Sequence, residues 1–300
     1  MPSLAGLLDA GISVPLVVTQ PDRAVGRHAE PRPTPVAAFA SASGLDTLKP
    51  DRLRGDAALL RRLEAARPDA LAVVAFGRIL PGEILALPRL APVNVHASLL
   101  PRYRGASPIQ AALLNGDAET GVVTMRIVEE LDAGPVYLSR TVPIGARETA
   151  GELSDRLAAA GAGLLVETLR GIEAGTLAPQ PQRGEASYCR PIRREDGAVD
   201  WSRDALAIAR RLRAFTPWPG LYTFLGTERI KILRAEETDA AAPGGPPGTF
   251  RLEDGRLVVS AGASTALEIS SVQRAGRRPV SGAEFARSSP LPGRFETAPK

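Results

Sequence analysis

Asn94 and His96 are the residues of this sequence whose types and spacing best suit chemistry. They lie in V-N-V-H (residues 93–96), where polar and apolar side chains alternate as in a β-strand, so both polar side chains project from one face. An amide beside an imidazole at a strand's end suits carbonyl chemistry, because the amide can stabilise an oxyanion while the imidazole transfers a proton. The structural alternative is that Asn94 merely ends the strand and His96 caps a turn, since N-x-H tripeptides are common.

A longer stretch of sequence favours the chemical interpretation. Residues 94–110 read N-V-H-A-S-L-L-P-R-Y-R-G-A-S-P-I-Q, and residues 131–135 read L-D-A-G-P. Both segments, at this separation, resemble the motifs of the 10-formyltetrahydrofolate-dependent formyltransferases. The resemblance implies that Asn94 stabilises a tetrahedral oxyanion and that His96 shares this role and passes a proton to the leaving nitrogen. It also implies that Asp132 orients the imidazole and favours its protonated form.

The same resemblance implies a folate site without a metal. 10-Formyltetrahydrofolate would be the formyl donor, with its ring between the loop at residues 76–81 and the turn after Asp132. The expected folate-binding residues are Phe76, Gly77, Ile79, Leu80, Pro81, Ser98, Leu99, Leu100, Pro101 and Gly134. With one cysteine and two histidines, the sequence also cannot supply a zinc cluster.

Strand and helix patterns alternate over the first 180 residues. A continuous apolar run at 70–75 is typical of a buried strand, and patterns at 122–127 and 136–142 predict a strand pair with Asp132 in its connection. Further patterns predict a strand at 14–18 and helices at 2–11, 34–40, 53–66, 150–174 and 203–214. Such alternation predicts an α/β fold with a Rossmann-like, doubly wound parallel sheet, whose site lies past the carboxyl ends of the strands.

The remainder of the chain has a different pattern. Short strand patterns separated by Gly, Pro and Asp turns predict a small OB-like β-barrel. We therefore expect a catalytic domain at residues 1–179, a linker at 180–202 and a barrel domain at 203–300. With 44% hydrophobic and 23% charged residues, no run of eighteen apolar residues and no secretory leader pattern, we expect a monomeric cytoplasmic protein without a membrane span.

Basic charge is concentrated in the last 120 residues. Residues 1–180 carry 18 Lys+Arg and 19 Asp+Glu, whereas residues 181–300 carry 19 and 14, a net charge of +5. A polyanion is one natural partner for such a domain, and an ordinary solvated surface is the alternative. The resemblance implies that the partner is initiator methionyl-tRNA. The expected tRNA-binding residues are Arg27, Arg190, Arg193, Arg194, Arg210, Arg211 and Arg213.

Segments outside the catalytic motif decide which formyltransferases the chain resembles. T-Q-P-D-R (19–23), A-F-G-R-I-L-P (75–81) and P-W-P-G-L-Y (217–222), together with the barrel, resemble the methionyl-tRNA formyltransferases. Members of that family begin with a strand and a G-T-P loop ahead of the P-S-L helix, whereas this sequence begins M-P-S-L. We therefore expect that a first strand is missing from this sequence, because a GTG valine codon within the gene has been read as the start codon. The alternatives are a sugar or nucleotide N-formyltransferase and a catalytically impaired RNA-binding remnant.

Overall fold

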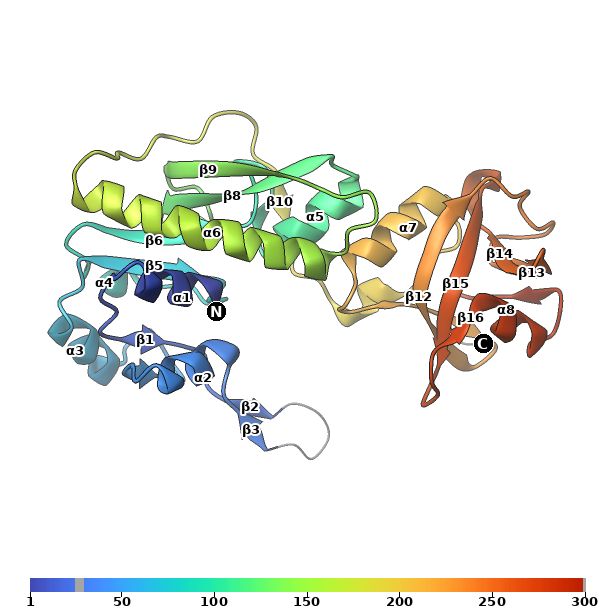
Figure 1. The fold of residues 1–300 in the computed structure, drawn as a ribbon, viewed down its shortest axis with the longest axis horizontal. Helices are drawn as coiled ribbons and strands as arrows, with labels where there is room; N and C mark the ends of the chain where they lie inside the picture. Colours follow the sequence, from blue (N-terminus) through green and yellow to red (C-terminus); the bar gives the residue numbers. More distant parts are fainter. Residues whose placement is uncertain (25–29, 299–300) are drawn as a thin grey trace. The chain divides into compact units, whose positions relative to one another are not determined.

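The computed structural model describes residues 1–24 and 30–298, and the chain forms two compact units (Figure 1). One comprises Met1–Pro108, Glu119–Pro143 and Asp155–Cys189, and the other comprises Ile109–Ala118, Ile144–Ser154 and Arg190–Lys300. The segment expected as a linker, residues 180–202, is divided between them, because residues 180–189 pack within the first unit.

The first unit is built on a four-stranded sheet with the order β5-β6-β8-β9. Its strands are β5 (Ala70–Val74), β6 (Ala91–His96), β8 (Glu119–Arg126) and β9 (Val136–Pro143). The Rossmann-like fold class is confirmed, but the sheet is mixed: β5 and β6 run parallel, while β6–β8 and β8–β9 are antiparallel. The hairpin connection between β8 and β9 is short because antiparallel neighbours need no crossover helix.

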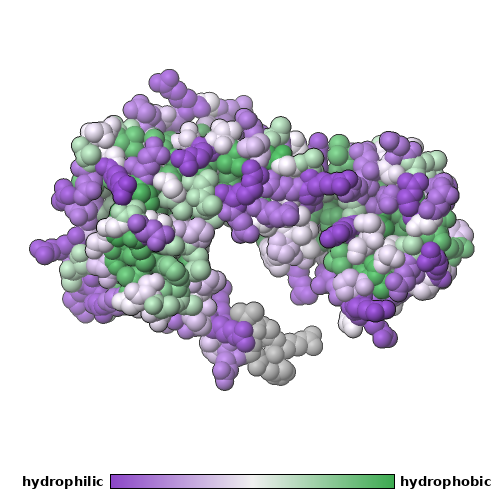
Figure 2. Space-filling view, in the orientation of Figure 1, coloured by the Kyte–Doolittle hydropathy of each residue, from purple (hydrophilic) through white to green (hydrophobic). Residues whose placement is uncertain are grey.

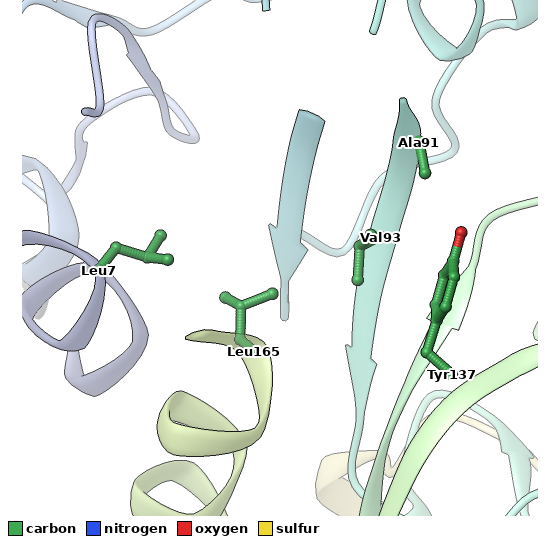
Figure 3. Packing of buried hydrophobic residues seen from close by; sticks show 5 residues of the cluster. All are labelled: Leu7, Ala91, Val93, Tyr137 and Leu165. Carbon is green, nitrogen blue, oxygen red and sulfur yellow. The ribbon is translucent and has the colours of Figure 1, made fainter. Parts of the chain in front are cut away.

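The core of this unit lies between the sheet and α6 (Ala150–Glu173), whose residues from Asp155 onward belong to the unit. Val93 from β6 and Leu165 from α6 are fully buried and share a cluster with Leu7 from α1 (Pro2–Asp9) and with Tyr137 from β9 (Figure 3). Residues from four elements distant in sequence thus meet on one face of the sheet, which fixes the orientation of β6.

A second, two-stranded sheet pairs β1 (Val17–Val18) with β4 (Thr47–Leu48) in parallel. Val18 from β1 and Leu71 from β5 pack on the same apolar cluster, which is centred on α3 (Ala57–Ala65) and α4 (Gly82–Leu85). Nevertheless, β1 and β5 are not paired with each other within residues 1–24 and 30–298. Val74 at the end of β5 is 41% exposed, and Figure 2 shows hydrophobic surface over α1 and β1.

Five further elements of the first unit are short: one helix and two pairs of two-residue strands. Helix α2 (Pro35–Ala42) begins as predicted: the Thr34 hydroxyl accepts a hydrogen bond from the Ala37 amide, and proline occupies the first helical position. Strands β2 (Arg23–Ala24) and β3 (Pro31–Arg32) pair antiparallel on either side of residues 25–29. Strands β7 (Arg104–Gly105) and β10 (Tyr188–Cys189) pair in parallel.

The second unit contains a seven-stranded antiparallel sheet with the order β11-β12-β15-β14-β13-β17, in which β16 also pairs with β15. Its strands are β11 (Leu221–Leu225), β12 (Glu228–Thr238), β13 (Thr249–Glu253), β14 (Arg256–Ser260), β15 (Ala266–Arg274), β16 (Val280–Ser281) and β17 (Gly293–Arg294). Phe224 and Glu296 exchange two backbone hydrogen bonds of 2.9 Å, which bring the last segment against β11 and nearly close the predicted barrel.

The core of the barrel is aromatic. Phe250, Phe285 and Phe295 are fully buried and have ring centroids 4.5–6.1 Å apart. The helices of the unit are α5 (Pro108–Asn115), α7 (Ala205–Ala214) and α8 (Gly282–Arg287), with short 3-10 turns at Arg194–Gly197 and Gly262–Ser264. Within the residues that the structure describes, no helix combines the length and apolarity that a membrane crossing requires.

Candidate active site

Strand β6 carries Asn94 and His96, the two residues whose types and spacing suit carbonyl chemistry. A side chain added at Gly161 of α6 would lie 2.9 Å from Val95 Cγ1, and Val93 shares the buried cluster of α6, so these valines face the helix. Because successive side chains of a strand point to opposite faces, Asn94 and His96 project from the other face. The structure therefore confirms the predicted strand and the shared face.

The imidazole of His96 is buried and contacts groups from two different segments. Its Nε2 lies 3.0 Å from the backbone oxygen of Tyr103, and its Nδ1 lies 3.7 Å from Oδ2 of Asp132. A carbonyl oxygen can only accept a hydrogen bond, so Nε2 carries the hydrogen in this contact. In the neutral ring Nδ1 is then the unprotonated nitrogen, and it faces the carboxylate.

Asp132 approaches the histidine from the connection between β8 and β9. Its backbone is left-handed, with φ of 49°, and its Oδ2 accepts a 2.8 Å hydrogen bond from the Gly105 amide. The side chains of His96 and Asp132 are 7% and 15% exposed. The structure thus brings together His96 and Asp132 from two motifs that are separate in sequence, and it places the carboxylate beside the imidazole.

A third segment, residues 182–189 of the predicted linker, supports both His96 and Asp132. Strand β10 pairs with β7, and the Ser187 hydroxyl accepts a 2.9 Å hydrogen bond from the Tyr103 amide. The side-chain amide of Gln182 donates hydrogen bonds of 2.7 and 2.8 Å to the backbone oxygens of Asp132 and Gly134. Nothing in the two motifs indicates Gln182; its position next to Pro181 in a stretch without periodicity gives no signal of its own.

Cys189 also belongs to this support. Its thiol contacts the backbone oxygens of Tyr103 and Arg104 at 3.5 and 3.4 Å and accepts a hydrogen bond from the Ser107 amide at 3.3 Å. Burial raises the pKa of the Cys189 thiol, and the nearby Asp132 carboxylate raises it further, while the Ser107 hydrogen bond opposes them. The thiol is therefore held in its protonated form and acts as a packing group rather than a nucleophile.

Four of the residues expected to bind folate line two different cavities. Ile79 and Pro81 line a cavity of about 380 Å³ with Leu53, Arg54 and Arg78. Leu99 and Leu100 line a cavity of about 430 Å³ beside β8 and β9, to which Gln182 also contributes.

Other members of the expected folate set have structural contacts. The Phe76 carbonyl accepts a 2.8 Å hydrogen bond from the Gln20 side chain, and Gly77 is left-handed with φ of 72°. The hydroxyl of fully buried Ser98 donates to the Arg102 carbonyl at 2.6 Å, and so closes the turn after β6. The peptide bond before Pro101 is cis.

The expected tRNA-binding arginines differ in how exposed they are and in the contacts that they make within the protein. Arg27 lies outside the described residues. Arg193 and Arg194 are exposed, and Arg190 forms an ion pair with Asp196. The hydrogen bond from Arg190, aided by that from the Arg193 amide, holds the pKa of Asp196 at about 2 despite some desolvation.

The three arginines of α7 are half-buried, whereas Arg193 and Arg194 are exposed. Arg211 donates a 2.5 Å hydrogen bond to the Asp196 carbonyl and lies 5.0 Å over the ring of Phe215, and burial lowers its pKa. Arg213 reaches the Gly145 carbonyl at 3.4 Å, and burial lowers its pKa as well. The guanidinium of Arg210 packs over Gly116, just after α5, where a positive charge complements the end of the helix.

The sequence matches a formyl transferase family model over residues 5–169 and a formyl transferase C-terminal domain model over residues 191–290. A methionyl-tRNA formyltransferase from Aromatoleum aromaticum is 43% identical over 299 residues, which cover 99% of this chain and 93% of the relative. One from Acidobacterium capsulatum is 44% identical over 295 residues, which cover 97% of this chain and 94% of the relative.

Solved structures also match the fold. The N-formyltransferase from Helicobacter canadensis, solved with folinic acid and dTDP-3-aminofucose, aligns with a TM-score of 0.66 at 19% identity, covering 91% of this chain and 94% of that one. HypX from Aquifex aeolicus, solved with tetrahydrofolic acid, aligns with a TM-score of 0.59 at 19% identity, covering 82% and 43%. At these identities the likeness concerns the fold alone.

Proposed function

Because this chain belongs to the methionyl-tRNA formyltransferase family, we propose that it transfers the formyl group of 10-formyltetrahydrofolate to the α-amine of initiator methionyl-tRNA. The observation that carries the proposal is the buried pair of His96 and Asp132, with Asn94 on the same face of β6. The pair occurs in a chain that matches two methionyl-tRNA formyltransferases over 97% or more of its length.

The proposed reaction begins when the neutral amine attacks the formyl carbon and the carbonyl electrons move onto oxygen. Asn94 donates a hydrogen bond to this oxyanion, and losing one such donor typically costs roughly 3–4 kcal/mol of transition-state stabilisation. The bond between the formyl carbon and N10 of the folate then breaks. The attacking nitrogen loses a proton and N10 gains one, so a group that exchanges protons must lie close to both.

His96 is the proposed proton carrier. Its contact with the Tyr103 carbonyl occupies Nε2, which leaves Nδ1 as the exchanging nitrogen. The carboxylate of Asp132, 3.7 Å away, stabilises the positive charge that develops on the ring during proton transfer.

Folate and tRNA contacts complete the proposal. The folate would lie against the loops of Phe76–Pro81 and of Ser98–Pro101, near Gly134, without a metal. The exposed arginines Arg193 and Arg194, with Arg190, would contact tRNA phosphates, and Arg27 would contact the acceptor end. The α7 arginines would support this surface from within the barrel unit, where they hold backbone and ring contacts. We further propose that the enzyme acts as a cytoplasmic monomer.

A formylation assay tests the function directly. Purified protein is incubated with charged initiator tRNA and 10-formyltetrahydrofolate labelled in the formyl group, and formylmethionine is measured after hydrolysis of the ester. A dTDP-amino sugar serves as the competing acceptor. We expect label on methionine only, and we expect its loss in His96→Ala and Asp132→Asn with the far-UV circular dichroism unchanged. Label on the sugar, or near-normal turnover in both variants, would refute the proposal.

A further inference from the structure

We propose that Gln182 is a positioning residue for the His96–Asp132 pair, because its side-chain amide ties the turn that carries Asp132 to the segment that holds His96. This inference rests on the proposed roles of those two residues. It concerns a side chain that lies 50 residues after Asp132 and that neither catalytic motif contains.

One end of the Gln182 amide fixes the turn. Nε2 donates to the backbone oxygens of Asp132 and Gly134, at 2.7 and 2.8 Å, so its two hydrogens are both used. Asp132 has φ of 49°, a left-handed conformation that is uncommon outside glycine and that persists where the surroundings hold it. The two hydrogen bonds, with that from the Gly105 amide to Oδ2, supply this constraint.

The other end of the amide reaches the histidine's side of the site. Oε1 accepts hydrogen bonds from Nε and Nη2 of Arg104, at 3.2 and 2.9 Å. Arg104 lies between Tyr103, whose carbonyl binds His96 Nε2, and Gly105, whose amide binds the Asp132 carboxylate. The opposite orientation of the amide would place donors against the guanidinium and an acceptor against two carbonyls, so the hydrogen bonds assign one orientation.

Such a bridge matters because the imidazole and the carboxylate do not fix each other. Nδ1 and Oδ2 are 3.7 Å apart, beyond the 2.7–3.2 Å of a hydrogen bond. Their separation is therefore set by the backbone segments that carry them, and Gln182 connects those segments. A misplacement of about 1 Å from a residue outside the chemistry can lower a rate about 10²-fold.

Two substitutions test this role with one matched control. Gln182→Met keeps the length of the side chain and removes every hydrogen bond, whereas Gln182→Glu keeps the contact with Arg104 but replaces both donors by acceptors. The control is Glu185→Ala, in the same segment, where the side chain is exposed. We expect kcat for formyl transfer to fall roughly 10- to 100-fold in both Gln182 variants, with KM for tRNA and folate within about threefold. The control should match the wild type.

A double-mutant cycle separates positioning from general damage. If Gln182 acts through Asp132, then Gln182→Met should cause no further loss in an Asp132→Asn background, where the residual rate is measured in single turnovers with enzyme in excess over charged tRNA. Additive losses, a change confined to KM, or an unchanged kcat in the single variants would overturn the proposal. Should Gln182→Met fail to fold, Gln182→Glu carries the same test, because it keeps the size and the Arg104 contact.

A spectroscopic readout is independent of activity. The sequence contains two histidines, His28 and His96, so imidazole ¹⁵N spectra are simple, and a His28→Asn variant assigns them. We expect Gln182→Met to shift the His96 resonances and to leave those of His28 in place. The control Glu185→Ala should move neither. Unchanged His96 resonances would overturn the positioning role. If the wild type formylates nothing while Gln182→Met shifts His96, the proposed function fails and the positioning role stands.

Discussion

The α-carbon of Gly134 lies so close to Arg126 that a methyl group on it would be 1.8 Å from the Arg126 carbonyl oxygen. The connection between β8 and β9 doubles back on the end of β8 here, and the Arg126 amide donates to the Pro135 carbonyl at 2.9 Å. Gly134 in L-D-A-G-P is thus required because the backbone of the connection closely approaches the backbone of β8. This approach sets the position of Asp132 within the connection.

Gly134→Ala should therefore separate the connection from β8. We expect a loss of about 1–3 kcal/mol in the free energy of unfolding, as for other overpacked sites, and a fall in kcat because Asp132 is displaced. Urea denaturation and the formylation assay measure the two effects. Gly163→Ala, on the exposed side of α6 within the same unit, is the control and should stabilise by about 0.5–1 kcal/mol. Equal behaviour of the two variants would contradict this account of Gly134.

The proposed catalytic residues could be predicted from sequence because each is part of a local pattern. Alternation over residues 93–96 placed Asn94 and His96 on one face, and the motif containing Asp132 lay in a connection between two strand patterns. Gln182 was missed because its proposed role depends on two backbone oxygens and one guanidinium that are far away in sequence. A polar residue in an irregular segment is most often solvated. Long-range hydrogen bonds to backbone atoms leave no periodicity to detect.

Helix and strand positions were predicted more closely than their extent. The helix expected at 53–66 forms only at Ala57–Ala65, where Asp56 caps its first turn by accepting from the Leu59 amide. The strand expected at 14–18 forms only at Val17–Val18, and the sheet expected to be continuous is in two pieces. A strand's length depends on its partners, which a local pattern does not contain.

The basic residues of the barrel unit should differ in their effect on tRNA binding. Arg194 is exposed, whereas Arg211 is bound to the Asp196 carbonyl and packed on Phe215. We expect Arg194→Gln to reduce the slope of log K against log salt concentration by about 1, because one phosphate contact is lost. Arg211→Gln should leave the slope nearly unchanged and lower the melting temperature, because a buried carbonyl loses its donor. Filter binding across a salt series, with thermal melts, measures both; equal slopes for the two variants would show that burial does not separate them.

The ion pair of Arg190 and Asp196 predicts how stability depends on acid. The pKa of Asp196 is held at about 2 in the folded chain against an ordinary 3.8. Because the folded value is the lower one, the carboxylate stabilises the fold above about pH 4, and this contribution is lost as the pH falls from about 4 to 2. Wild type and Asp196→Asn should therefore differ in unfolding free energy at pH 5 and converge near pH 2. The difference should be modest, since Arg190 is 62% exposed and water screens the pair. A constant difference across this range in urea titrations would disprove the linkage.

Strand β5 lies at one end of its sheet, and its outer edge has no partner strand in the described part of the chain. Its sequence, A-L-A-V-V, is that of a buried central strand, yet within the described residues it pairs only with β6, and Val74 is 41% exposed. Strand β1 likewise pairs only with β4, although both strands pack on the cluster around α3. A strand lying between β1 and β5 would pair with both edges and cover this apolar surface.

We therefore expect that extending the chain upstream of Pro2 by about a dozen residues, enough for one apolar strand and a loop, stabilises the protein by several kcal/mol. Total stability of a domain is only about 5–15 kcal/mol, so formyl-transfer activity per milligram should rise with the folded fraction. The matched control is an extension of equal length made of Gly and Pro, because proline lacks the backbone donor and glycine lacks the side chain that a central strand needs. Urea denaturation and the formylation assay compare the three chains. If the apolar extension is no more stable than the Gly/Pro extension, the edges of β1 and β5 do not accept a strand, and water satisfies their backbone groups instead.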